Sequence, residues 1–129
     1  MAEIAARNRT QTDLDGLAGV CQRFAQQSAE TEKAVHHAAD FFRCVGRATH
    51  NQVLGLAQEP LLHLLEPSLR VMIDKVPQAR SRITTAQRRI LDAIGKHDAE
   101  AARGWMARHV RDFRKGYEVA NIGLDCRIA

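Results

Sequence analysis

The sequence is poor in cysteine and in aromatic residues, and it has no long apolar run. Its three cysteines are an odd number at unrelated spacings, which disfavours a disulfide framework, a zinc finger and a dithiol redox site. No apolar stretch reaches the roughly 18 residues that a membrane-spanning helix needs, and the N-terminus lacks the basic and apolar regions of a secretion signal. These absences predict a soluble cytoplasmic protein with reduced thiols at Cys21, Cys44 and Cys126.

A strand pattern and the common catalytic motifs are also absent. No segment alternates apolar and polar residues as a half-buried strand does, and no glycine-rich phosphate-binding loop occurs. The serines have no histidine and aspartate at suggestive positions, which leaves nucleophilic catalysis without support. We therefore expect no enzyme activity and no cofactor from this chain of 129 residues, which has the size of one ordinary domain.

The positive charge is concentrated towards the C-terminus. The formal net charge is +4, yet residues 80–115 alone contain ten Lys or Arg and four Asp or Glu. Arg103, Arg108, Arg111 and Arg114 lie three to five residues apart, as on the solvent-facing side of an amphipathic helix. A nucleic-acid surface is the alternative. We interpret the basic excess as a solvated helix face.

Apolar residues recur at intervals of three and four through most of the chain, which predicts helices. Thr12 and Asp15 match the capping-box pattern at the start of the first full helix, and Asp98 is placed to cap the last one. The expected helices run from Asp13 to about Ala29, from Thr31 to about Ala48, from Asn51 to about Ile73, from Thr84 or Thr85 to Gly95, and from Asp98 to about Asn121.

Three prolines interrupt these patterns. Pro60 and Pro67 fall within the leucine-rich segment, and because proline lacks an N–H we expect a kinked or divided helix there. Pro77 lies in the weakly periodic segment Val76–Arg82, which we predict to be the one substantial loop. Helices joined by short connections predict an all-α antiparallel bundle without an internal domain boundary.

The last two helical patterns meet within the segment from Arg89 to Val110 and predict a helical hairpin that lines a pocket. Glycine at position 95 and aspartate at position 98 mark the turn, in line with their roles after and before helices. The final helix presents a narrow apolar stripe that contains one histidine. The stripe consists of Ala102, Trp105, Met106, His109, Val110, Phe113 and Tyr117.

Three segments resemble the C-terminal effector-binding (FCD) domain of FadR-type GntR transcription regulators. They are AARNRTQTDLDGL at residues 5–17, FFRCVGRATHNQVL at residues 41–54 and QRRILDAIGKHDAEAARGWMARHV at residues 87–110. The resemblance covers nearly the whole chain and implies one FCD-like bundle of about six helices, spanning residues 1–129. It also implies a homodimer, with DNA contacted only through a winged helix-turn-helix that is absent from this chain.

The same resemblance places a metal site in the bundle interior. In metal-binding members an Asp and a His one helical turn apart, a His on the next-to-last helix and a His on the last helix hold one divalent cation. Aligned on Asn51, these positions fall on Ala38, Phe42, Gln87 and His109. Only His109 is a ligand of the expected type, so we predict that no metal is bound in that cavity.

The candidate ligand-binding residues follow from these positions. His109 is either a polar anchor for a ligand or a core histidine with one ring nitrogen satisfied by a neighbour. His36 and Asp40 stand one helical turn apart, but on the opposite face from Ala38 and Phe42, where we expect solvent. The complete candidate set is His109, Gln87, Phe42, Ala38, Arg88 and Arg43, the two arginines being long enough to reach a carboxylate.

We therefore expect the ligand-sensing and dimerisation domain of a bacterial regulator, binding a small organic acid or acyl compound in the bundle interior. The apolar side chain of Phe42 favours a more apolar cavity than the metal-binding members have. The alternative is a dimerisation module that has lost effector and metal binding. A small helical enzyme is disfavoured, because His109 with Gln87 is too sparse a set for acid–base chemistry.

Overall fold

The computed structural model describes residues 1–27 and 29–128, and the side chains of residues 1–27 and 29–115. This part of the chain forms six helices and no strand, which confirms the all-α class and the bundle. Tyr117 and Cys126 of the sequence analysis lie outside the described side chains. The helices are α1 (Ala2–Asn8), α2 (Gln11–Gln27), α3 (Thr31–Ala48), α4 (Gln52–Lys75), α5 (Ala79–Gly95) and α6 (Ala99–Ile128).

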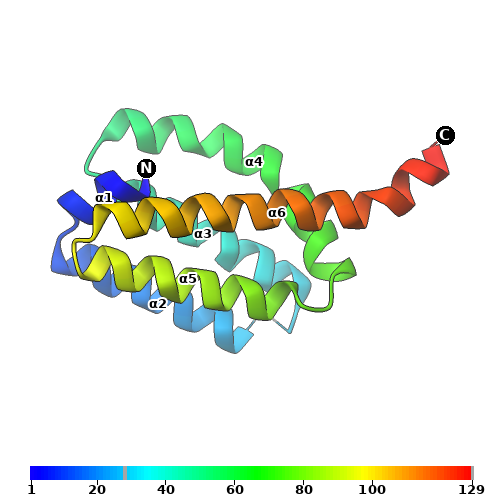
Figure 1. The fold of residues 1–129 in the computed structure, drawn as a ribbon, viewed down its shortest axis with the longest axis horizontal. Helices are drawn as coiled ribbons and strands as arrows, with labels where there is room; N and C mark the ends of the chain where they lie inside the picture. Colours follow the sequence, from blue (N-terminus) through cyan, green and yellow to red (C-terminus); the bar gives the residue numbers. More distant parts are fainter. Residues whose placement is uncertain (28, 129) are drawn as a thin grey trace.

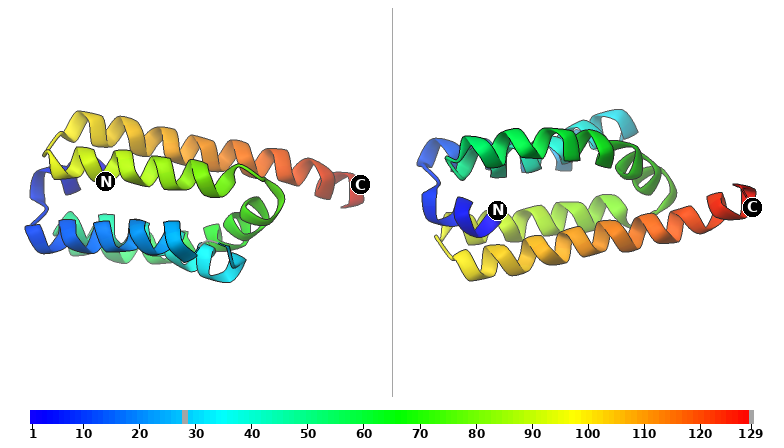
Figure 2. Two further views of the ribbon diagram at one scale, coloured as in Figure 1. Left: turned by 90° about the horizontal axis from the view of Figure 1, so that it is seen from below. Right: turned by 90° about the horizontal axis from the view of Figure 1, so that it is seen from above.

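The helices form an elongated bundle in which α2 and α3, α3 and α4, and α5 and α6 run side by side in opposite directions (Figure 1). The α5–α6 hairpin makes up one side of the bundle, and α2 and α3 lie on the opposite side (Figure 2). α4 crosses from α3 to contact α6, and the short α1 packs against α3, α5 and α6. The interior therefore lies between the hairpin and the pair α2–α3, with α4 covering one edge.

The starts of α2, α4 and α6 are set by side chains that accept hydrogen bonds from free backbone N–H groups, whereas α1, α3 and α5 begin without a side-chain cap. Asn51 caps α4, since its Oδ1 accepts from the backbone nitrogens of Val53 and Leu54 at 3.0 and 3.2 Å. The predicted capping box at Thr12 and Asp15 is wrong. The reciprocal pair is Thr10 with Asp13, in which the Asp13 backbone N–H donates to Thr10 Oγ1 and the Thr10 N–H donates to Asp13 Oδ2.

Two predicted boundaries also differ from the structure. The expected loop Val76–Arg82 shrinks to residues 76–78, because α5 begins at Ala79 rather than at Thr84 or Thr85. Ala79 and Ile83 are both buried, so one apolar contact per turn suffices to extend the helix through this polar segment. α6 continues to Ile128, beyond the expected end near Asn121, and passes the ends of its neighbours in Figure 1.

α4 contains both Pro60 and Pro67 as one continuous helix. Figure 2 shows that it changes direction near its C-terminal end, which agrees with the predicted kink and rules out the predicted alternative of two separate helices. The bend carries Leu69, Met72 and Ile73 inward, where each is at most 4% exposed. The C-terminal part of α4 thereby closes one end of the interior.

The core consists of two apolar clusters along the bundle. One is built around Phe41 and Ile90, and the other around Phe42, Ile83 and Phe113. Met106 packs against both clusters, so they meet at its level. This junction is the place where polar side chains enter the core.

Candidate functional site

Two polar side chains from the α5–α6 hairpin are buried at the junction of the two clusters. Gln87 lies between Ile83 and Ile90 on α5 and is completely buried, and His109 on α6 is 2% exposed. Both amide atoms of Gln87 and Nε2 of His109 have no hydrogen-bond partner among the described residues. Buried polar atoms of this kind are rare in folded proteins and destabilise the fold unless a ligand or water bonds to them.

The imidazole of His109 is surrounded by aromatic rings. It stacks on Phe42, with ring centroids 5.6 Å apart and planes inclined by 14°, and its centroid is 4.3 Å from that of Phe113. Burial among these rings lowers the pKa of His109 to about 4, although the negative charge of Asp112 acts in the opposite direction. His109 is therefore neutral at neutral pH.

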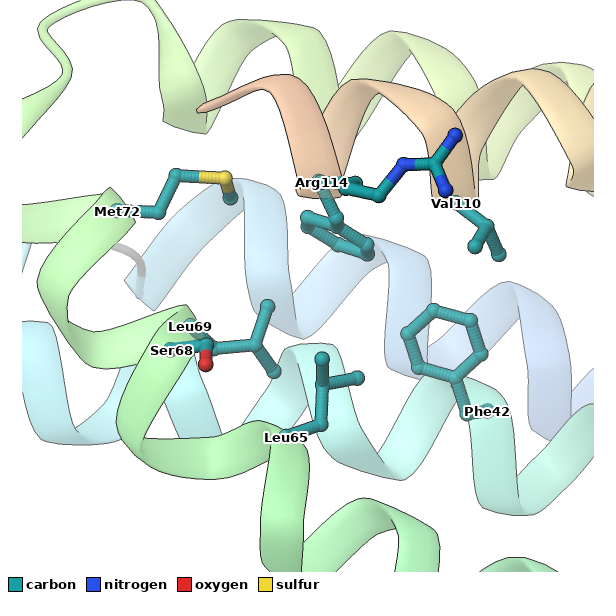
Figure 3. Close-up of a pocket in the computed structure, with 8 residues that line it drawn as sticks. Phe42, Leu65, Ser68, Leu69, Met72, Val110 and Arg114 are labelled. Atoms are coloured by element: carbon teal, nitrogen blue, oxygen red, sulfur yellow. The ribbon is translucent and has the colours of Figure 1, made fainter. Parts of the chain in front are cut away.

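An apolar cavity of about 260 Å³ adjoins this aromatic group (Figure 3). It lies between α3, the bent part of α4 and α6, and two of its walls are Phe42 and Phe113. Ser68 and Arg114 supply its polar groups, and the remaining lining residues are Leu65, Leu69, Met72 and Val110. A cavity with this lining suits the hydrocarbon part of a small ligand.

A family model described as FCD domain matches residues 1–112. The chain belongs to the FCD domain family. The FCD domain is the C-terminal effector-binding domain of GntR/FadR-type transcription regulators, which confirms the resemblance inferred from the sequence. Curated proteins give no match to the chain. Among the described residues, no helix is both long and apolar enough to cross a membrane.

The metal-ligand positions of the FCD family do not fit a metal ion in this chain. Ala38 and Phe42 line the same buried face of α3, where they are 1% and 8% exposed, and neither side chain has a lone pair to donate. The Phe42 ring instead packs flat on His109. With Gln87 as the third position, His109 is the one remaining ligand of the usual kind, too few to hold a divalent cation.

The two candidate arginines of this FCD domain lie elsewhere. Arg43 bonds to Glu59 at 2.8 Å and to Asp40 at 3.2 Å, and it lies 3.6 Å from Glu66. These contacts join α3 to α4, and the bond to Glu59 is the main reason why the pKa of Arg43 is raised. Arg88 is exposed and lines a shallow groove between α2 and α5. Neither arginine lines a cavity that contains Phe42 or His109.

The contribution of α4 to this cavity was not predicted from the sequence. Because α4 bends, its C-terminal part turns four side chains toward the cavity, namely Leu65, Ser68, Leu69 and Met72. A signal was present in the sequence, since Ser68 and Pro67 interrupt an otherwise leucine-rich segment. Arg114 was assigned to the solvated face, yet it stands at the edge of the cavity.

His36, His37 and Asp40 form a second polar group on α3, with one ligand atom from each within 4.8 Å of the others. His36 is exposed, as expected, and its Nε2 lies 3.3 Å from Asp40 Oδ2. His37 is more buried and shares a hydrogen bond of 3.0 Å with Gln27. The other carboxylate oxygen of Asp40 accepts from Arg43, so this aspartate already serves the α3–α4 contact.

Proposed function

We propose that this FCD domain binds a small organic acid or acyl compound and passes the binding signal to a DNA-binding domain. The observation that carries the proposal is the apolar cavity, which has hydrocarbon and aromatic side chains on its walls and the exposed Arg114 in its lining. The hydrocarbon part of such a ligand could fill the cavity while its polar group lies at the edge. In a full-length regulator the DNA contact would come through an attached winged helix-turn-helix in the cytoplasm.

The charge of such a ligand would lie at the cavity edge. A carboxylate buried beside His109 would find no cation there, because a histidine with a pKa near 4 is neutral at neutral pH. Arg114 lines the same cavity and is exposed, so its guanidinium could bind a carboxylate bidentately. We therefore expect the hydrocarbon chain to point inward and the acid group outward.

A thermal-shift titration with octanoate and other organic acids tests this proposal. A ligand that binds only the folded protein raises its stability, by about 2.7 kcal/mol at a ligand concentration 100 times Kd. Arg114→Gln should reduce the shift, whereas Arg111→Gln, an equal change of charge on the same helix, should leave it intact. If no organic acid or acyl compound raises the melting temperature, the effector-binding proposal is wrong.

We also propose that the domain forms a homodimer through the outer face of α4. The apolar side chains on this face are the most exposed of the described chain, at 74% for Val53, 75% for Leu56, 64% for Leu61 and 77% for Leu64. The one Asp, Glu, Lys or Arg between residues 52 and 64 is Glu59, which is 46% exposed and paired with Arg43. A second copy would meet no like charge across a two-fold axis, whereas a charged partner would find no complement.

Light scattering on size-exclusion fractions measures this association. The combined change Leu56→Glu and Leu64→Glu should produce monomers, because it would place unpaired charges in the interface. The exposed pair Gln22→Glu and Gln26→Glu on α2 is the matched control. A dimer that persists without any response to acids would favour the alternative function, a dimerisation module without effector binding.

A further inference from the structure

A groove of about 430 Å³ runs along the outside of the α5–α6 hairpin. Four cationic side chains line it, two from each helix, and the one carboxylate in its lining is Asp112. The cations are Arg82, Arg89, Arg108 and Lys115. None of these four makes an ion pair among the described residues, so the groove concentrates positive charge without neutralising it.

The four cations form two pairs at opposite ends of the groove. Arg82 and Arg89 are seven residues apart on α5, and Arg108 and Lys115 are seven apart on α6. Seven residues of helix correspond to about 10 Å. Since the helices are antiparallel, Arg89 and Arg108 lie at one end, where both guanidiniums contact the Trp105 ring, at 4.4 and 5.6 Å from its centroid. Arg82 and Lys115 lie at the other end.

The middle of the groove is built differently from its ends. Thr85 contributes a hydroxyl group between the two ends, whereas Trp105 lies at the Arg89–Arg108 end, where its contact with Arg89 holds that guanidinium in place. The buried His109 also contributes to the groove wall. A concave surface with like charges at both ends and polar groups between them favours an anion over a cation or an apolar chain.

We propose that this groove is an anion-binding site for a small organic bisphosphate, with one phosphate bound at each pair of cations. A single phosphate can reach one end alone, because the two ends are about 10 Å apart. Two phosphates on one molecule would bind both ends at once, and the second contact would act intramolecularly. The site is distinct from the acid-binding cavity, so the proposal does not depend on the function proposed above.

The single tryptophan of the chain provides a direct measurement, because Trp105 lies within the groove. Its fluorescence is titrated with fructose 1,6-bisphosphate, fructose 6-phosphate and inorganic phosphate at constant ionic strength. We expect saturable binding of the bisphosphate, at least tenfold tighter than that of either monophosphate. Equal affinities for all three would overturn the two-ended site.

Two double variants with the same change of net charge locate the binding. Arg82→Gln with Lys115→Gln removes one end without touching Trp105, and should lower bisphosphate affinity about tenfold while monophosphate affinity stays unchanged. Arg103→Gln with Arg111→Gln alters exposed positions of α6 outside the groove and should change neither by more than about twofold. Equal losses in both variants would mean general charge attraction and contradict the proposal. Tighter binding of duplex DNA, with displacement of the bisphosphate, would assign the surface to nucleic acid instead.

Discussion

Gln87 offers the sharpest test of the buried polar group, because its amide is fully buried and neither amide atom has a hydrogen-bond partner among the described residues. A buried polar group without a hydrogen bond costs about 1–3 kcal/mol. Gln87→Met keeps the length of the side chain and its helix propensity while removing the amide. We therefore expect the variant to be about 1–3 kcal/mol more stable than the wild type, although most substitutions in a core are destabilising.

Urea unfolding measures this change as a higher midpoint at an unchanged m-value. In a domain of this size each kcal/mol corresponds to roughly 3–6 °C in melting temperature. Gln22→Met, at an exposed position on α2, is the control and should change stability by less than about 0.5 kcal/mol. A loss of more than about 1 kcal/mol in Gln87→Met would refute the reasoning, since it would mean that the amide is bonded in the unliganded protein.

Three further predictions concern the interior and its supports. Acidification from pH 8 to pH 5 should lower the free energy of unfolding by about 2 kcal/mol more in the wild type than in His109→Gln, as measured by urea unfolding at each pH. His109 takes up a proton near pH 6.5 in the unfolded chain but only near pH 4 in the folded chain. Keeping it neutral in the folded state therefore costs no stability above pH 6.5, and lowers the free energy of unfolding increasingly as the pH falls below that value. Arg43→Met should lower the free energy of unfolding by about 1–2 kcal/mol, because it leaves Asp40, Glu59 and Glu66 close together without their cation. The loss should be smaller in 1 M NaCl, which screens the repulsion between these carboxylates. An unchanged urea midpoint would contradict this prediction. A methyl group added at Gly46 would overlap Gln58 Oε1. The change in the free energy of unfolding caused by Gly46→Ala should therefore be about 1 kcal/mol more favourable in a Gln58→Ala background than in the wild type. A double-mutant cycle measures this difference.

The helices could be predicted from the sequence because each has a long apolar stripe, and the errors fall where that signal is weak. The pairs Thr10–Asp13 and Thr12–Asp15 have the same spacing, so the sequence cannot say which one caps α2. The structure selects Thr10, whose extended neighbour Arg9 also donates to the carbonyl groups of Ile94 and Gly95. That choice depends on a contact with residues more than 80 positions away in the chain, which no local pattern contains.

The burial of two candidate residues could be predicted from the sequence, whereas the cavity could not. The resemblance placed His109 and Gln87 correctly in the interior, because both lie on regular helices with a clear register. The cavity itself depends on the bend of α4, which sets the direction of Leu65 and Met72. Val110 was assigned to the apolar stripe but is 51% exposed, since His109 occupies the inward direction on that turn of α6.

The contrast between the interior and the surface of the α5–α6 hairpin limits what this domain can recognise. Inside, His109 is kept neutral by its burial among aromatic rings, and two of the metal-ligand positions hold Ala38 and Phe42. Outside, Arg82, Arg89, Arg108 and Lys115 make no ion pair among the described residues. The cavity would therefore select ligands by their shape and hydrocarbon content, and the charged group of a ligand would bind at the cavity edge or in the outer groove. A ligand that carries its charge in the middle of its apolar part would have no favourable position in this fold.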